Sequence, residues 1–193
     1  KNIYMREAIL LAHKSKDSGE IPVGCIIVDK YNKIISRAFN TVKTDKDPTA
    51  HAEINAIRFA CKELKTDRLI GHDMYVTLEP CMMCAVAISR AKIRRLYYGA
   101  DDLQYGSING NFNFFQSKNC NHIPEIYDNI DKNECENIKE RTKMGRDYFI
   151  EKNNRWGRNV GSVEDRDTFL NKPKTKEVVK FLKMGKSVRD ISG

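Results

Sequence analysis

Apolar residues recur along the chain with two different spacings, and these spacings predict alternating helices and strands. Within residues 2–17, apolar side chains such as Ala8, Leu11 and Ala12 fall on one face of a helix. Residues 50–64 repeat this spacing, whereas short runs rich in β-branched and aromatic residues indicate strands. The expected helices are 2–17, 50–64, 80–91 and 132–150, and the expected strands are 22–29, 34–39, 73–78, 94–99 and 122–127.

The alternation of strands with helices predicts an α/β fold. We expect a three-layer α/β/α sandwich around a mixed central sheet of about five strands, covering residues 1–150. Beyond residue 150 the chain becomes polar and rich in glycine and charge, and only 175–184 has the spacing of a short basic amphipathic helix. Residues 151–193 are therefore predicted to be a basic linker and helical tail outside this domain.

Basic residues are concentrated near the C-terminus. The 193 residues carry a formal net charge of +8, and residues 139–193 hold 15 Lys and Arg against 8 Asp and Glu. This region favours nucleic-acid binding, although a solvated tail has the same composition. No apolar run approaches the roughly 20 residues of a membrane span, and the first residues do not form a secretion signal. We expect a cytoplasmic protein with no membrane partner.

Two short motifs bring together residue types that bind zinc. His51 and Glu53 lie where one helix is expected to begin, and Cys81 and Cys84 form a C-x-x-C pair at the start of the next. One imidazole and two thiolates leave a fourth coordination position for water, as in catalytic zinc sites. A structural site would need a further pair of ligands at matching spacing. We predict that His51, Cys81 and Cys84 bind one Zn²⁺.

Glu53 is predicted to carry protons in the reaction, because it is close to the metal without being a ligand. Zinc lowers the pKa of its water to about 7, and Glu53 would move protons from that water to the ring nitrogen and the departing ammonia. A lone histidine at a helix start or a lone C-x-x-C pair has ordinary structural or redox explanations. The joint H-x-E and P-C-x-x-C pattern instead indicates a zinc-dependent nucleobase deaminase.

Four longer segments resemble the bacterial tRNA-specific adenosine deaminases of the cytidine and deoxycytidylate deaminase superfamily. The segments are Gly19–Gly24, Asp47–Glu53, Tyr75–Cys84 and Tyr98–Ala100. The resemblance implies the cytidine-deaminase fold and a homodimer. It also implies a hydrolase that uses a zinc-activated water to convert adenosine to inosine at the wobble position of a tRNA anticodon loop.

The resemblance adds two candidate substrate-binding residues. Asn40 matches a family asparagine that contacts the target nucleotide, and Asp102 matches a loop aspartate beside the substrate strand. From the residues alone, Asn40 could equally be a turn residue that closes a strand, and Asp102 a solvated carboxylate. Glu79 is expected to steady the start of the following helix by hydrogen bonding, rather than to act in catalysis.

The C-terminal tail resembles a different family. Residues 140–145 and 154–161 resemble the region of a serine recombinase that joins its long helix to its DNA-binding end. Residues 176–191 resemble the first part of that helix-turn-helix, but the recognition helix and the recombinase catalytic domain are missing. We therefore expect a fusion, rather than a tail that binds a defined DNA site.

Two alternative functions share part of this pattern. A zinc guanine deaminase that acts on the free base has the same H-A-E and P-C-x-x-C elements, although the Leu78-Glu79 and Gly99–Asp101 sequences favour the tRNA enzyme. A nucleic-acid-binding module with a degenerate deaminase domain is the other alternative, and the intact Glu53 argues against it.

Overall fold

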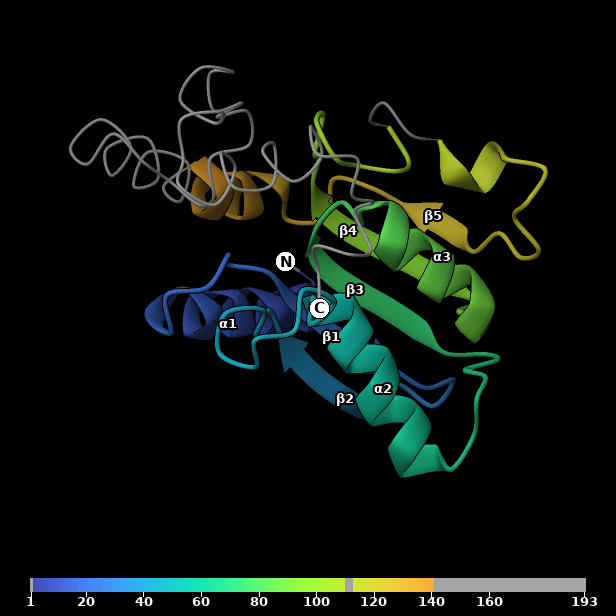
Figure 1. The fold of residues 1–193 in the computed structure, drawn as a ribbon. Helices are drawn as coiled ribbons and strands as arrows, with labels where there is room; N and C mark the ends of the chain where they lie inside the picture. The colour runs from blue at the N-terminus through green and yellow to red at the C-terminus, as the bar shows by residue number, and fades with distance from the viewer. Residues whose placement is uncertain (1, 110–112, 141–193) are drawn as a thin grey trace, which may run out of the picture. The chain divides into compact units, whose positions relative to one another are not determined.

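The structure, a computed structural model, describes residues 2–109 and 113–140 and contains one five-stranded sheet (Figure 1). The elements in chain order are α1 (Ile3–Asp17), β1 (Gly24–Val28), β2 (Ile34–Phe39), α2 (Ala52–Leu64), β3 (Asp73–Leu78), α3 (Met82–Ala91), β4 (Arg95–Ala100), η1 (Phe114–Gln116) and β5 (Glu125–Tyr127), followed by a helix over 132–140. The strand order is β2-β1-β3-β4-β5. β1 is antiparallel to β2 and β3, whereas β3, β4 and β5 are parallel, so the sheet is mixed.

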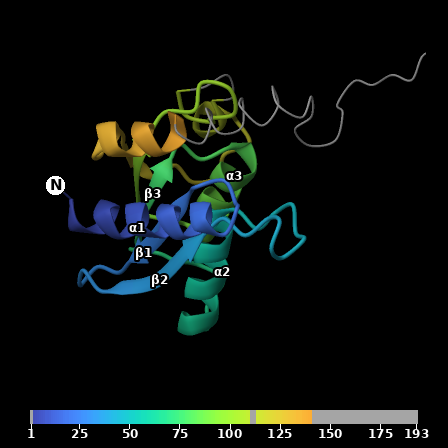
Figure 2. The same ribbon diagram turned by 90° about the vertical axis from the view of Figure 1, so that its left-hand side faces the viewer.

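Helices cover both faces of this sheet (Figures 1 and 2). α2 and α3 lie on one face, where Ile88 and Val76 belong to the same buried cluster. α1 and the helix over 132–140 share a second cluster that includes Ala8 and Ile138, on the opposite face. The predicted three-layer α/β/α sandwich with a mixed sheet of five strands is confirmed.

The interior position of β1, between β2 and β3, explains its continuous run of apolar residues. All five of its residues are buried, because neighbouring side chains alternate between two covered faces. Cys25 and Ile27 join the core beneath α2 and α3, while Ile26 and Val28 join the cluster beneath α1. A central strand covered on both sides therefore has no polar face for the sequence to mark.

The predicted bounds of most helices and strands agree with the observed bounds to within two residues. Two differences between them are informative. α3 begins at Met82 and not at Pro80, whose carbonyl oxygen accepts hydrogen bonds from the Ser107 backbone N–H and hydroxyl. The fifth strand is shorter than expected: it begins at Glu125 and not at residue 122. At position 122 the histidine ring contacts the carbonyl oxygen of Ile93 at 2.6 Å.

Several expectations concern residues that the structure does not describe. The helix expected over 132–150 is present over 132–140. The domain boundary after residue 150 and the basic tail over 151–193 lie outside the described residues. Among the described residues, no helix combines the length and the apolar character needed to cross a membrane.

α1 crosses β1 in direct backbone contact at Gly24. A Cβ atom at this position would overlap the carbonyl oxygen of Ala8 and lie 2.7 Å from the amide nitrogen of Ala12. We expect Gly24→Ala to lower the free energy of unfolding by about 1–3 kcal/mol, the usual cost of overpacking a rigid core. Urea-induced unfolding measures this change.

Gly71→Ala is the matched control for this prediction. Gly71 has a φ of +80°, and a Cβ built there meets nothing within 4 Å, so its substitution costs only the left-handed backbone strain of about 1–2 kcal/mol. If Gly24→Ala proves less destabilising than Gly71→Ala, the close approach of α1 to β1 is not the limiting contact.

Candidate active site

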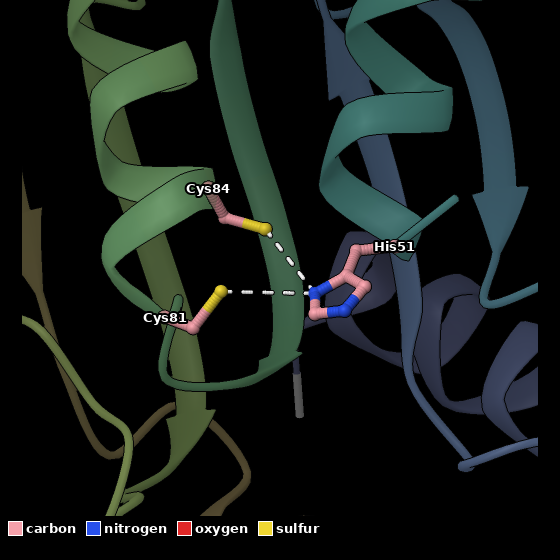
Figure 3. A group of neighbouring side chains, drawn as sticks. All are labelled: His51, Cys81 and Cys84. Atoms are coloured by element: carbon pink, nitrogen blue, oxygen red, sulfur yellow. Dashed lines mark hydrogen bonds between the residues drawn. The ribbon is translucent and has the colours of Figure 1, made fainter. Parts of the chain in front are cut away.

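The N-termini of α2 and α3 carry the three predicted zinc ligands (Figure 3). His51 is the N-cap of α2, Cys81 is the N-cap of α3, and Cys84 lies in the first turn of α3. The His51 Nδ1 atom lies 3.7 Å from the Cys81 sulfur and 3.6 Å from the Cys84 sulfur. The structure therefore brings together residues about 30 positions apart in the chain.

The N-cap positions direct these side chains toward one another. His51 and Cys81 both have extended backbone angles, and neither side chain caps its own helix. Each side chain can therefore contact the others, and Figure 3 shows the ring of His51 and the two sulfurs directed toward one another. Unpaired N–H groups and the helix dipole at such a terminus favour a thiolate.

The cluster shares its protons in a way that suits a metal site. Hydrogen bonding from Cys84, together with that from His51, lowers the pKa of Cys81 to about 4. The pKa of Cys84 is raised because its thiol bonds to Cys81 and because it is buried. The pKa of His51 is raised, mainly by its hydrogen bond to Cys81. A metal ion takes the place of such shared protons when it binds.

The separations within the cluster fit a tetrahedral zinc ion. Zn–S bonds of about 2.3 Å and Zn–N bonds of about 2.0–2.1 Å place sulfur and nitrogen ligands about 3.6 Å apart. The ligand atoms of His51, Cys81 and Cys84 all lie within 4.8 Å of one another. In the described part of the chain this group has three members, which leaves one tetrahedral position for water. That number of protein ligands is typical of a catalytic zinc.

Glu53 lies beside the cluster, in the first turn of α2. The side chain is buried, with 4% of its surface exposed, and it interacts with His51, Cys81 and Cys84. Burial is the main cause that raises the pKa of Glu53 to about 7. A carboxyl group with this pKa gains and loses a proton near neutral pH, as a general acid and base must.

Asn40 is buried rather than part of an exposed turn, with 3% of its surface accessible. It follows β2 directly, and its Nδ2 donates a hydrogen bond to the Glu20 carboxylate at 3.2 Å. Because a carboxylate only accepts hydrogen bonds, the Asn40 NH₂ group must face Glu20, which turns Oδ1 the other way. The orientation of this amide is therefore fixed.

Glu20 was not singled out in the sequence, yet it organises the segment between β2 and α2. Its Oε1 accepts hydrogen bonds from the backbone N–H groups of Lys43 and Thr44, both at 2.8 Å. The side chain is 5% exposed. The only available signal was its place within the Gly19–Gly24 motif, because backbone partners leave no pattern of side chains.

Asp102 lies in a loop that is joined to the start of α3. An isolated β-bridge connects Gly106 of this loop with Cys81. The Asp102 Oδ1 accepts hydrogen bonds from the N–H groups of Gln104 and Tyr105, so the carboxylate closes a turn. Asp102 is therefore more than a solvated carboxylate, because it also closes this turn.

The Glu79 carboxylate forms hydrogen bonds beyond the helix start, where its role was expected. Its carboxylate accepts from the backbone N–H groups of Asp102, Ile108 and Asn109, all in the loop after β4. The side chain is 3% exposed. Glu79 therefore holds this loop, which the sequence did not indicate.

The fold and the site together define a zinc-dependent deaminase. A mixed sheet places two helix N-termini side by side, and these supply a His-Cys-Cys group with an adjacent buried glutamate. The family described as the cytidine and deoxycytidylate deaminase zinc-binding region matches residues 1–100. The chain therefore belongs to the cytidine and deoxycytidylate deaminase family.

Its similar proteins include several tRNA-specific adenosine deaminases. The enzyme of Rickettsia bellii is 46% identical over 65% of this chain and 88% of its own length, and that of Agrobacterium fabrum is 42% identical over 77% and 93%. A solved tRNA:A34 deaminase, from work on A-to-I editing at the wobble position of transfer RNA, has 43% identity and a TM-score of 0.69. It covers 70% of this chain and 97% of its own. The guanine deaminase of Bacillus subtilis is 38% identical, with a TM-score of 0.50 over 52% of this chain and 66% of its own.

Proposed function

We propose that this chain catalyses the hydrolytic deamination of adenosine to inosine at the wobble position of a tRNA. The observation that carries the reaction type is the His51, Cys81 and Cys84 group with buried Glu53 beside it. The choice of substrate rests on the relatives of 42–46% identity that are tRNA-specific adenosine deaminases. These relatives align with the chain over most of their own length.

Glu53 performs the proton transfers of this reaction. His51, Cys81 and Cys84 would hold a zinc ion, which would supply a Lewis acid for the activation of water. Glu53 takes one proton from the attacking water and delivers it to N1 of the adenine ring, and it then takes the remaining proton from the new C6 hydroxyl and delivers it to the amino group that leaves as ammonia. A C6–O bond forms and the C6–N6 bond breaks, so the step needs no oxidant. Burial raises the pKa of Glu53, which favours uptake of a proton by this carboxyl before it delivers one.

Asn40 and Asp102 are the proposed contacts to the nucleotide. Glu20 holds the amide of Asn40 so that Oδ1 is turned away from it, and an amide oxygen is a suitable acceptor for a ribose hydroxyl or an exocyclic amine. Asp102 lies in the loop that is bridged to Cys81. Asn40 begins the segment that leads into α2, whereas the loop of Asp102 follows β4 and reaches α3 through its bridge to Cys81.

Sequencing of total tRNA after incubation with the protein tests this function. We expect adenosine-to-inosine changes confined to the first anticodon position, and none with the Glu53→Ala variant. Free guanine in a parallel ammonia-release assay tests the related purine activity. Release of ammonia from guanine, with no change in any tRNA, would show that the substrate is free guanine and not tRNA. Salt-dependent RNA binding without deamination of either substrate would indicate a binding module.

An unpaired anticodon loop should react far faster than the same sequence held in a duplex. The target base must leave its stack to reach the metal, and in a duplex this costs a few kcal/mol. A penalty of about 3 kcal/mol corresponds to a rate difference of roughly 100-fold. Single-turnover rates on a hairpin and on its fully paired counterpart measure this ratio, and equal rates would contradict it.

We also propose that the chain forms a homodimer in the cytoplasm. Phe59 in α2 and Met82 at the start of α3 are 54% and 38% exposed, and apolar side chains of this size suit a protein interface. Light scattering should give twice the mass of the chain. A Phe59→Glu variant should shift that mass toward the monomer, and a monomeric wild-type protein would exclude this assembly.

The basic tail is proposed to be an addition to the deaminase and not part of its core. Residues 152–193 carry 11 Lys and Arg against 5 Asp and Glu, and they have few large apolar residues outside 178–184. The resemblance of this segment to a serine recombinase supports a separate origin. We place the boundary of the deaminase domain after residue 150.

Deleting residues 152–193 should leave the zinc content, the melting temperature and turnover at saturating tRNA nearly unchanged. The proposed ligands and Glu53 all precede residue 85. Affinity for tRNA should fall mainly at low salt, because non-specific phosphate contacts are displaced by counterions. Titration of tRNA at several salt concentrations measures this for both chains. Loss of turnover at saturation would make the tail part of the enzyme.

A further inference from the structure

Glu79 is a buried carboxylate that accepts hydrogen bonds from three backbone groups of one loop. It follows β3 and stands two residues before Cys81, and 3% of its surface is exposed. Its Oε2 accepts the N–H of Asp102 at 2.9 Å. Its Oε1 accepts the N–H groups of Ile108 at 2.8 Å and Asn109 at 2.7 Å. One side chain thus holds both ends of the segment 102–109.

The same segment is fitted closely against the start of α3. Ser107 donates its backbone N–H and its hydroxyl to the carbonyl oxygen of Pro80, at 3.1 and 2.7 Å. Gly106 forms a bridge with Cys81. A Cβ on Gly106 would overlap the Glu79 carboxylate and the Asp102 carbonyl oxygen. The loop has this position only because residue 106 has no side chain.

The hydrogen bonds of Glu79 continue through Asp102 into the exposed part of the loop. Glu79 fixes the backbone of Asp102, and Asp102 Oδ1 in turn accepts the N–H groups of Gln104 and Tyr105 at 3.2 and 3.3 Å. Hydrogen bonds from amides to a carboxylate are stronger than those between neutral groups. A buried acceptor that serves three of them restrains the loop before any ligand arrives.

We propose that Glu79 is a positioning residue for substrate binding, which acts by holding the loop of Asp102 against the start of α3. This inference rests on the proposed function, because it takes Asp102 to be a contact to the RNA. Glu79 itself is not a proton carrier, since both of its oxygens are occupied by backbone donors of the loop. A preorganised loop binds RNA without the entropy cost of ordering it, so the effect falls on affinity.

The Glu79→Gln variant tests this role. Glutamine keeps the shape of the side chain, but its NH₂ group donates, so at least one of the three loop N–H groups loses its acceptor. We expect KM for an anticodon stem-loop RNA to rise about tenfold, as the loss of one charge-assisted hydrogen bond implies. The value of kcat should change by less than about threefold, and zinc should stay at one ion per chain.

Asp73→Asn is the matched control, because Asp73 is a buried carboxylate on β3, the strand that Glu79 follows. It starts β3, at the end opposite Glu79, and it accepts two hydrogen bonds from Arg94, both at 2.8 Å. Its replacement should lower the melting temperature without changing KM. An equal rise of KM in Asp73→Asn and Glu79→Gln would mean that KM reports general destabilisation, and the positioning role would be wrong.

A double-mutant cycle with Asp102→Ala shows whether Glu79 acts through Asp102. We expect Glu79→Gln to raise KM by less than about twofold when Asp102 is already alanine, because coupled residues are not additive. Full multiplication of the two effects on KM would overturn the proposal.

Gly106→Ala is the alternative variant if Glu79→Gln fails to fold. It displaces the loop from the other side and should give the same rise in KM at full zinc content. An unchanged KM would again overturn the proposal. A wild-type chain that deaminates no tRNA would refute the proposed function instead.

Discussion

Replacing Glu53 by glutamine is expected to lower kcat by about 10²- to 10⁴-fold or more, while zinc stays at one ion per chain. Glutamine has nearly the volume of glutamate but cannot accept or deliver a proton. Glu53 is buried against the cluster, so no solvent carboxylate replaces it there. Because the residue is not one of the three grouped ligand atoms, its loss should leave the metal in place. Single-turnover kinetics and metal analysis of the same preparation measure both quantities.

The Glu53 result has two informative controls. Glu53→Asp retains a carboxyl but withdraws it by one methylene, so its activity should lie between those of the wild type and Glu53→Gln. RNA affinity should be nearly equal in all three proteins, because the change removes proton transfer and not binding. If Glu53→Gln lost zinc as completely as a cysteine variant, Glu53 would have to be regarded as a ligand.

Replacing Cys84 by alanine should abolish both zinc retention and deamination. Cys84 is fully buried, and its sulfur lies 3.6 Å from the Nδ1 of His51. With only two ligands left, the site no longer competes for the ion, and activity should fall by at least about 10⁴-fold because the activated water is lost with it. A bound ion also stabilises the folded state in proportion to its affinity. The melting temperature of Cys84→Ala should therefore not respond to added zinc, whereas that of the wild type should.

Cys61→Ala is the matched control for the cysteine variant. Cys61 is a free and partly buried thiol in α2, outside the His-Cys-Cys group. Its replacement should keep one zinc per chain and the wild-type response of the melting temperature to zinc. Full zinc content and turnover in Cys84→Ala would show that the metal is held elsewhere.

The sequence predicted the fold and the metal group because both are recorded in side-chain type and spacing. The strands 34–39 and 73–78 have the bounds that their apolar runs indicated. His51 and Cys84 lie 33 positions apart, and they were expected to meet because the H-x-E and P-C-x-x-C motifs each mark an expected helix start. The roles of Glu53, Asn40 and Asp102 remain predictions for the experiments above.

Two features could not be predicted, for a common physical reason. Glu20 and Glu79 both act on backbone N–H groups, and every residue except proline offers such a donor. No partner residue type therefore marks these backbone contacts in the sequence. Their surroundings are similar: each is a buried glutamate that holds one of the two proposed substrate contacts, Asn40 or Asp102.

The position of the metal ligands at two helix N-caps has a consequence for local opening of the chain. An ion bound by His51 and Cys84 closes a loop between residues 33 positions apart, which removes conformational freedom from any partly opened state. Neither α2 nor α3 could then fray at its first turn without breaking a bond to the ion. Amide hydrogens in the opening turns of both helices should exchange as one unit when zinc is bound, and independently once it is removed.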